Sequence, residues 1–222
     1  MDLTSPVVAA VGALAGGLLG LGADRLAVRW PEHDPSEPEH PPGRRFGWRS
    51  FVVIAVGAAA FGLLPGRFAD DPLALAVFGA WFATLVIGLA TDLDQRLLPD
   101  VLTLPVIPIG LGYAVSGLNP LVGGDWVLAV AVALAIPAVL YLPSLFYGAG
   151  AFGIGDVKLL VGAGLLLGLE RAFSGVLSGL LLAGVVLIVL LAARRIGRRS
   201  YVPFGPFLIL GALWAVLVLR PA

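Results

Sequence analysis

Long uninterrupted runs of apolar residues, separated by short polar stretches, dominate this chain of 222 residues. The runs do not alternate as half-buried strands do, and most lack the charged face of a helix in a soluble protein. A transmembrane helix needs about 20 consecutive apolar residues. We therefore predict an all-α, polytopic membrane helix bundle with about eight spans, at roughly 5–23, 50–65, 73–91, 101–117, 125–147, 156–169, 173–193 and 203–219.

Composition supports a membrane protein and excludes several kinds of site. Hydrophobic residues make up 59% of the chain and charged residues only 13%, far from the averages of soluble domains. The absence of cysteine excludes disulfides, thiolate metal sites and a cysteine nucleophile. The formal net charge is zero, so bulk charge does not indicate nucleic-acid binding. The 30 glycines suit close contact between helix backbones.

The basic residues predict the orientation in the membrane. With the N-terminus outside, the inner segments carry eleven Lys and Arg residues and the outer segments three, as the positive-inside rule requires. This orientation places Asp92 and Asp156 at cytoplasmic ends of spans. The four arginines from 194 to 199 are interpreted as anchors beside anionic lipid. The inner residues are Arg25, Arg29, Arg44, Arg45, Arg49, Arg96, Lys158, Arg194, Arg195, Arg198 and Arg199, and the outer ones are Arg67, Arg171 and Arg220.

The longest polar stretch covers residues 29–49 and is rich in Pro and Glu. Such a segment cannot bury a core, so we predict a flexible cytoplasmic loop. His33 and His40 are the only histidines and both lie in it, which argues against a histidine-based metal site. We predict one membrane domain over residues 1–222, without an internal repeat.

Asp92 stands where the third apolar run meets a short loop, a place where a carboxylate near hydrocarbon is costly. Asp94, Arg96 and Asp100 follow. A solvated loop with an Asp92–Arg96 ion pair is the simplest interpretation, and we favour it for Asp94 and Arg96. Asp100 follows Pro99 and precedes an apolar run, which is typical of a helix N-cap. Asp92 differs because it directly joins the hydrophobic run.

Asp156 opens the sixth run, directly after the segment Gly153–Gly155. The glycines allow another backbone to approach closely, and a helix dipole stabilises an Asp at a helix start. A plain N-cap explains the same residues about equally well. For Lys158 we favour a structural role, with the ammonium reaching the headgroups, over a place beside the carboxylates. Asp92 and Asp156 meet only if the third and sixth spans pack side by side.

Three remaining features have simple interpretations. Asp125 and Glu170 lie at the outer face in this orientation and are interpreted as interfacial caps. The segment Pro203–Pro206 opens the last span with two prolines and a glycine. Irregular backbone of this kind is tolerated where it lines a cavity, but a simple helix start is favoured on physical grounds.

Three motifs, taken together, resemble those of the type IV prepilin peptidases, the leader peptidases of the GxGD class of intramembrane aspartic proteases. The first runs from Asp92 to Asp100, with an Asp seven residues before the Pro of a Leu-Pro-Asp turn. The second, Phe152–Leu160, is similar to the GxGD motif followed by Lys and Leu. The third, Val202–Phe207, is similar to a Pro-Phe-Gly-Pro segment. The resemblance covers roughly residues 73–219, the expected peptidase core.

The resemblance implies that Asp92 and Asp156 are the catalytic pair and that the family's substrates are pilin-like precursors in the bilayer. The family removes a basic leader at the cytoplasmic face, after a glycine and ahead of the mature hydrophobic helix. Two close carboxylates cannot both ionise easily, so one holds a proton. The ionised one takes a proton from water while the other polarises the scissile carbonyl, and no metal or cofactor is required. The supporting motif residues are Pro99, Asp100, Gly153, Gly155, Lys158, Pro203, Phe204, Gly205 and Pro206.

The chain departs from many bacterial members between its first two spans. Those members carry a cytoplasmic domain there with paired cysteines, linked to N-methylation of the new pilin terminus. Here that position holds about 20 polar residues and no cysteine. We therefore expect peptidase activity without methyltransferase activity. The presenilin branch shares GxGD but has a different C-terminal motif, so it ranks lower.

Two hypotheses from other classes stay open. Intramembrane acids also mark ion pathways in small transporters, although here they lie at one face and no repeat is evident. The chain is also compatible with an inactive structural subunit of a pilus or secretion machine. The sequence leaves the particular substrate and the oligomeric state open.

Overall fold

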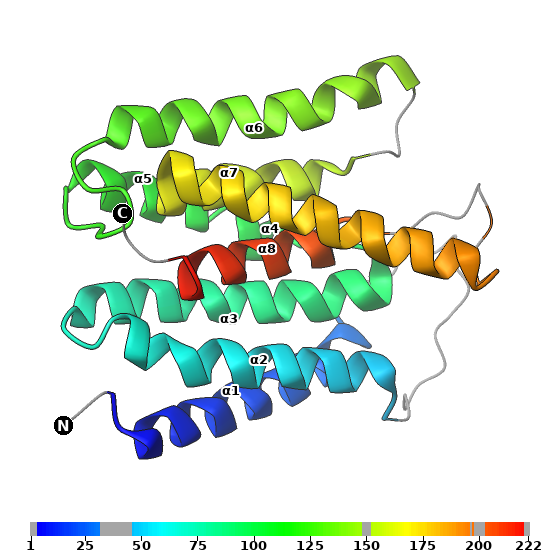
Figure 1. Cartoon of the computed structure of the whole chain (residues 1–222), viewed down its shortest axis with the longest axis horizontal. Helices are drawn as coiled ribbons and strands as arrows, with labels where there is room; N and C mark the ends of the chain where they lie inside the picture. Colours follow the sequence, from blue (N-terminus) through cyan, green and yellow to red (C-terminus); the bar gives the residue numbers. More distant parts are fainter. Residues whose placement is uncertain (1–3, 32–45, 148–151, 196, 198–202, 220–222) are drawn as a thin grey trace. The chain divides into compact units, whose positions relative to one another are not determined.

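The computed structural model describes residues 4–31, 46–147, 152–195, 197 and 203–219, and every regular element in these ranges is a helix (Figure 1). The predicted all-α fold is thereby confirmed for the described residues. The chain divides into two compact units, Met1–Leu102 and Thr103–Ala222. Most of the predicted 29–49 loop, with His33 and His40, lies outside the described residues, as do Arg44, Arg45, Arg198, Arg199 and Arg220.

The first unit consists of three long helices, α1 (Pro6–Ala27), α2 (Trp48–Arg67) and α3 (Pro72–Gln95). Each of the three contacts the other two, and they lie side by side in Figure 1. Two of them begin with a proline at the first position, where its missing N–H costs nothing. The helices match the first three predicted spans and extend beyond each of them by a few residues.

Side-chain caps determine where α1 and α3 begin. The hydroxyl of Ser5 accepts a hydrogen bond from the N–H of Val8 at 3.3 Å. The carboxylate of Asp71 accepts one from the N–H of Ala74 at 2.8 Å. The first N–H groups of a helix have no partner within it, so such caps stabilise the start.

The second unit is built around α7 (Ile154–Ala192), which contacts α5 (Val106–Val115), α6 (Trp126–Tyr147) and α8 (Gly205–Leu217). The short helix α4 (Asp100–Thr103) spans the boundary between the units. α4 and α5 occupy the predicted 101–117 span, which is therefore not one helix. The break lies at Leu104 and Pro105, because a proline lacks the N–H that would continue α4.

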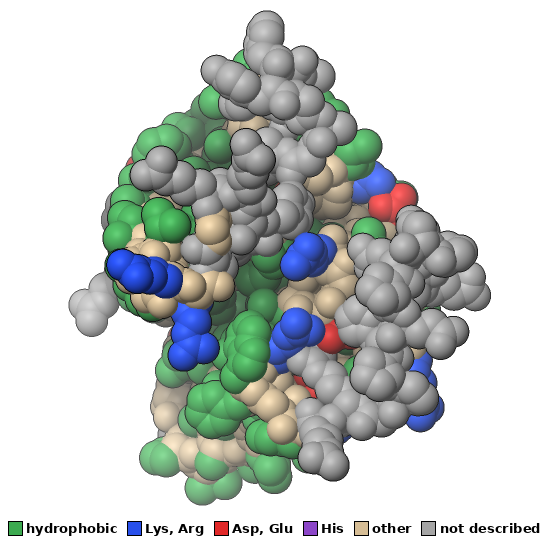
Figure 2. All heavy atoms as spheres, turned by 90° about the vertical axis from the view of Figure 1, so that its right-hand side faces the viewer, with side chains coloured by type: hydrophobic (Ala, Val, Ile, Leu, Met, Phe, Trp, Pro, Cys, Tyr) green, Lys and Arg blue, Asp and Glu red, His purple; other side chains and the backbone are tan. Residues whose placement is uncertain are grey.

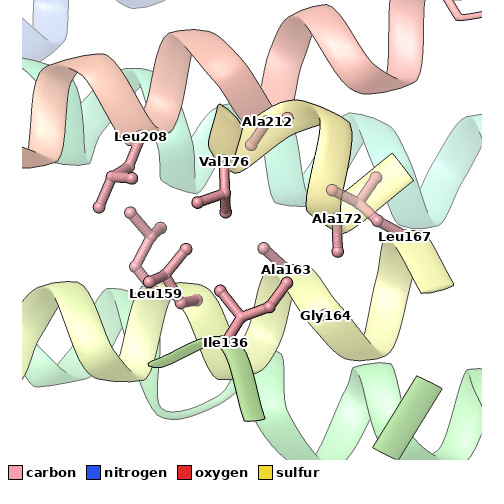
Figure 3. Close-up of a pocket in the computed structure, with 11 residues that line it drawn as sticks. Ile136, Leu159, Ala163, Gly164, Leu167, Ala172, Val176, Leu208 and Ala212 are labelled. Carbon is pink, nitrogen blue, oxygen red and sulfur yellow. The ribbon is translucent and has the colours of Figure 1, made fainter. Parts of the chain in front are cut away.

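Gly168 divides α7 into two helical segments that run back alongside each other (Figure 3). Its φ of 69° and ψ of −174° lie in a region that is essentially restricted to glycine. In Figure 3, Leu159 and Leu167 mark the direction of the first segment, and Ala172 and Val176 mark the return of the second. The predicted spans 156–169 and 173–193 thus correspond to the two segments, and the reversal lies slightly before the predicted break.

Among the described residues, four helices are long and apolar enough to cross a membrane by length and composition, namely α1, α2, α3 and α7. The apolar helices over Asp100–Val115, Trp126–Leu142 and Gly205–Leu217 are shorter. The membrane character of the prediction is supported, whereas the number of eight spans is not.

Candidate active site

Asp92 lies in the last turn of α3 and is buried, with 5% of its surface exposed. α3 continues for three residues beyond it and ends at Gln95, so Asp92 does not close the helix as predicted. Arg96 stops the helix in the left-handed conformation, with φ 57°, and its N–H donates to the backbone oxygen of Asp92 at 3.0 Å. Asp92 is therefore held in regular, capped helix.

Asp94 is not in a solvated loop, and the prediction for it was wrong. Its side chain is 1% exposed, and Oδ1 accepts a 2.9 Å hydrogen bond from Nη1 of Arg49 in the first turn of α2. The two residues are 45 positions apart, so no local signal in the sequence could reveal the ion pair. From the sequence alone, Arg49 is one of the inner basic residues and nothing more.

Pro99 and Asp100 lead from α3 into α4. The carbonyl oxygen of Pro99 accepts a hydrogen bond from the N–H of Leu102 at 3.0 Å. Asp100 is exposed and is the first residue of α4, so the helix starts one position earlier than an N-cap at Asp100 would require.

Asp156 lies in the first turn of α7 with 9% of its surface exposed. The residue at the N-cap position is Gly153, and its N–H donates to Oδ2 of Asp156 at 3.3 Å. Asp156 therefore caps the helix from its third position, not from the N-cap itself. Gly155 and Lys158 lie in the same first turns and are half-buried.

The Pro-Phe-Gly-Pro segment forms the start of α8. Phe204 is the N-cap residue, Gly205 and Pro206 are the first two helical residues, and both are buried. Phe204 accepts a hydrogen bond from the N–H of Leu208 at 3.2 Å. The simple helix start favoured from the sequence is confirmed, and Pro203 lies just before it.

An apolar pocket lies within the second unit, between α6, the two segments of α7, and α8 (Figure 3). Leu159 is three residues beyond Asp156, and Leu208 is two residues beyond Pro206, so both predicted motifs border the pocket. Its lining contains no titratable side chain among the described residues. The lining residues are Ile136, Leu159, Leu160, Ala163, Gly164, Leu167, Ala172, Gly175, Val176, Leu208 and Ala212.

The two candidate aspartates belong to different units, Asp92 to the first and Asp156 to the second. Each is a buried carboxylate in the terminal turn of a long apolar helix. A group of three or more acidic or imidazole side chains that could hold a metal ion does not occur within the described ranges. Figure 2 looks onto the side where α2 begins and α3 ends, and it shows Lys and Arg side chains among hydrophobic ones.

Comparison with known proteins gives one family. The sequence model of the type IV leader peptidase family matches residues 79–192, which include both aspartates. A prepilin leader peptidase/N-methyltransferase of Burkholderia pseudomallei is 34% identical over 160 residues, covering 72% of this chain and 51% of the relative. The corresponding protein of Aeromonas salmonicida is 36% identical over 128 residues, or 57% of this chain and 43% of the relative.

A third relative with the same name, from Dickeya chrysanthemi, is 30% identical over 176 residues, covering 79% of this chain and 62% of the relative. The chain spans about half the length of the first curated relatives it matches. No solved structure matches it.

Proposed function

This chain belongs to the type IV leader peptidase family, and we propose that it is a membrane-embedded aspartic endopeptidase that removes the basic leader from type IV prepilin-like precursors. The observation that carries the proposal is the position of Asp92 and Asp156. Each is buried in a terminal turn of an apolar helix, within the residues that match the family. Buried carboxylates in such places are costly and mark functional sites.

The proposed chemistry needs the two carboxylates to share one proton. The ionised carboxylate removes a proton from the attacking water, and the protonated one donates a hydrogen bond to the scissile carbonyl oxygen. The protons then titrate as a property of the pair. The other motif residues transfer no proton in this scheme. They are Pro99, Asp100, Gly153, Gly155, Lys158, Pro203, Phe204, Gly205 and Pro206.

We place the enzyme in the inner membrane with multiple passes, the N-terminus outside and the active site toward the cytoplasm. The apolar helices and the family support the membrane location, and the eleven-to-three distribution of basic residues supports the orientation. Eight passes would follow if the two segments of α7 cross separately and the shorter apolar helices also cross.

Substitution of each aspartate tests the proposal. Wild type, Asp92→Asn and Asp156→Asn are reconstituted with a synthetic precursor that has a basic leader, a glycine and an apolar helix. Loss of an acid–base group lowers the rate by about 10²–10⁴-fold, and both variants should show a loss of this size. Cleavage is measured by the mass of the products.

Two exposed acids give matched controls for the change of charge. Asp70→Asn in the first unit and Asp125→Asn in the second should cleave at the wild-type rate, because both side chains are exposed and lie outside the three motifs. If Asp92→Asn and Asp156→Asn still cleave, the aspartic mechanism is wrong. If wild type cleaves no such precursor but conducts protons across vesicles, the transporter hypothesis replaces it.

We further propose that this chain lacks methyltransferase activity, although the printed names of its relatives include N-methyltransferase. The support is the absence of cysteine, in particular between α1 and α2. Incubation of cleaved product with the enzyme and an isotopically labelled methyl donor tests this. Label on the new N-terminus would contradict the proposal.

A further inference from the structure

Side-chain links join the helices of the first unit at the end where Asp92 lies. The hydroxyl of Ser50 in α2 donates to Oδ2 of Asp24 in α1 at 2.7 Å. The guanidinium of Arg49, the residue before Ser50, donates to Asp94 in α3 at 2.9 Å. Two consecutive residues of α2 thus hold the other two helices.

A third link closes the set. The amide of Gln95 in α3 donates a hydrogen bond to the backbone oxygen of Ala27 at the end of α1. Each pair among the three helices is therefore connected by at least one side-chain hydrogen bond. We call Asp24, Ala27, Arg49, Ser50, Asp94 and Gln95 the three-helix clamp.

The clamp is largely buried. Asp24, Ser50, Asp94 and Gln95 are all less than 9% exposed, and only Arg49 reaches solvent, with 33% of its side chain exposed. Burying polar side chains is costly unless they are hydrogen-bonded, and each of these four side chains makes a hydrogen bond to another helix. Oδ2 of Asp94 and Oε1 of Gln95 are buried without a hydrogen-bond partner among the described residues, so it is the three inter-helix links, not full satisfaction of every polar atom, that restrain this end of the helices.

Asp94 and Gln95 lie in the same turn of α3 as Asp92. Side chains two positions apart on a helix do not face each other. The ion pair between Arg49 and Asp94 therefore restrains this turn without binding the Asp92 carboxylate. The clamp acts on the backbone that carries the proposed catalytic group.

We propose that Arg49 is a positioning residue for the peptidase reaction: through its ion pair with Asp94 it holds the last turn of α3, and so fixes the place of Asp92. This inference rests on the proposed function, in which Asp92 is catalytic. Arg49 lies outside the residues 79–192 that match the family. In this proposal α1 and α2 hold the end of α3, the helix that carries Asp92.

The test compares kcat and KM for cleavage of the synthetic precursor by the full-length protein in vesicles. A displacement of about 1 Å in a reacting group lowers the rate by as much as about 100-fold. Arg49→Ala should therefore lower kcat by about 10- to 100-fold, with KM unchanged because no substrate contact is lost. Arg49→Lys keeps the charge and should recover part of kcat. Arg29→Ala removes an exposed basic residue near the same end and should match wild type.

A double-variant cycle separates positioning from a general effect. If Arg49 acts through Asp94, the double variant R49A/D94N loses no more kcat than the worse single variant. Losses that multiply would overturn the inference, as would a higher KM at unchanged kcat. Rates are expressed per folded molecule, from the unfolding curve of each variant. A fall in rate explained entirely by less folded protein would also overturn it.

Failure of this inference is distinguishable from failure of the proposed function. If Asp92→Asn is inactive while Arg49→Ala keeps the wild-type kcat, only the positioning role is wrong. If Asp92→Asn cleaves normally, the proposed function itself fails, and Arg49 has no catalytic group to position.

Discussion

Gly16 and Gly57 bring α1 and α2 into backbone contact. A Cβ atom built on Gly16 would stand 2.1 Å from the carbonyl oxygen of Gly57, and one built on Gly57 would stand 2.3 Å from the oxygen of Gly16. Real Cβ atoms do not approach backbone oxygen so closely. Only glycine fits at either position, and the hairpin that carries Asp24, Arg49 and Ser50 depends on this contact.

We predict that Gly16→Ala lowers the free energy of unfolding by about 1–3 kcal/mol, the usual cost of overpacking. Gly22→Ala is the control, because Gly22 lies in the same helix with nothing within 4 Å of its Cβ position. In a helix interior Ala is more stable than Gly by about 0.5–1 kcal/mol, so the control should be neutral or stabilising. Unfolding in mixed micelles, followed by circular dichroism, measures both. Equal stability of the two variants would contradict the contact.

Replacing Gly168 in the second unit should also destabilise the protein, but for a different reason. Its backbone conformation costs a non-glycine residue about 1–3 kcal/mol, so Gly168→Ala should destabilise the protein by that amount. Gly184→Ala, in the second segment of α7, meets nothing within 4 Å and should cost no stability. The comparison uses the same unfolding measurement. A stable Gly168→Ala protein would mean that α7 does not reverse at this glycine.

Arg171 should stabilise the C-terminal end of α8. It is 7% exposed, and Nη1 donates to the backbone oxygens of Ala215 at 2.9 Å and Leu219 at 2.6 Å. A cation at a helix C-terminus also complements its dipole. A hydrogen bond from a charged group contributes about 1.5–3 kcal/mol to stability. Arg171→Ala should therefore lower the free energy of unfolding by at least about 1.5 kcal/mol. Arg195→Ala removes an exposed arginine and should hardly change the free energy of unfolding. The prediction fails if the two variants have the same free energy of unfolding.

The proposed orientation predicts which residues face each side of the membrane. Because the chain has no cysteine, single substitutions give unambiguous labelling sites. Leu118, between α5 and α6, and Leu97, after α3, are 59% and 46% exposed. A membrane-impermeant thiol reagent added to intact cells should label Leu118→Cys and not Leu97→Cys, and cell lysis should make the second accessible. The reverse pattern would invert the topology.

The helices of the first unit could be predicted because their signals are local. Apolar run length gives the span, and Ser5 and Asp71 cap helices that begin with proline. The full extent of α3 was not anticipated. Helix propensity and hydrophobicity hardly change over the few residues on either side of such a boundary, so a pattern alone places it only approximately.

Asp92 and Asp156 were recognised from the sequence because a carboxylate beside a long apolar run is unusual and because the motifs around them match a family. The interpretation of Asp94 was wrong for a physical reason. A carboxylate near a helix end looks solvated until its partner is known, and Arg49 lies in another helix.

The sequence by itself determined the helical class, the family and the positions of the two candidate aspartates, since these depend on residues that are neighbours along the chain. Only the tertiary structure decided which side chains are satisfied by partners on other helices. Arg49 with Asp94, Gly16 with Gly57 and Arg171 with Ala215 are each about 40 residues or more apart. Such contacts arise because packed helices must fill space and pair their buried polar groups, a requirement that the whole fold imposes and no short segment contains.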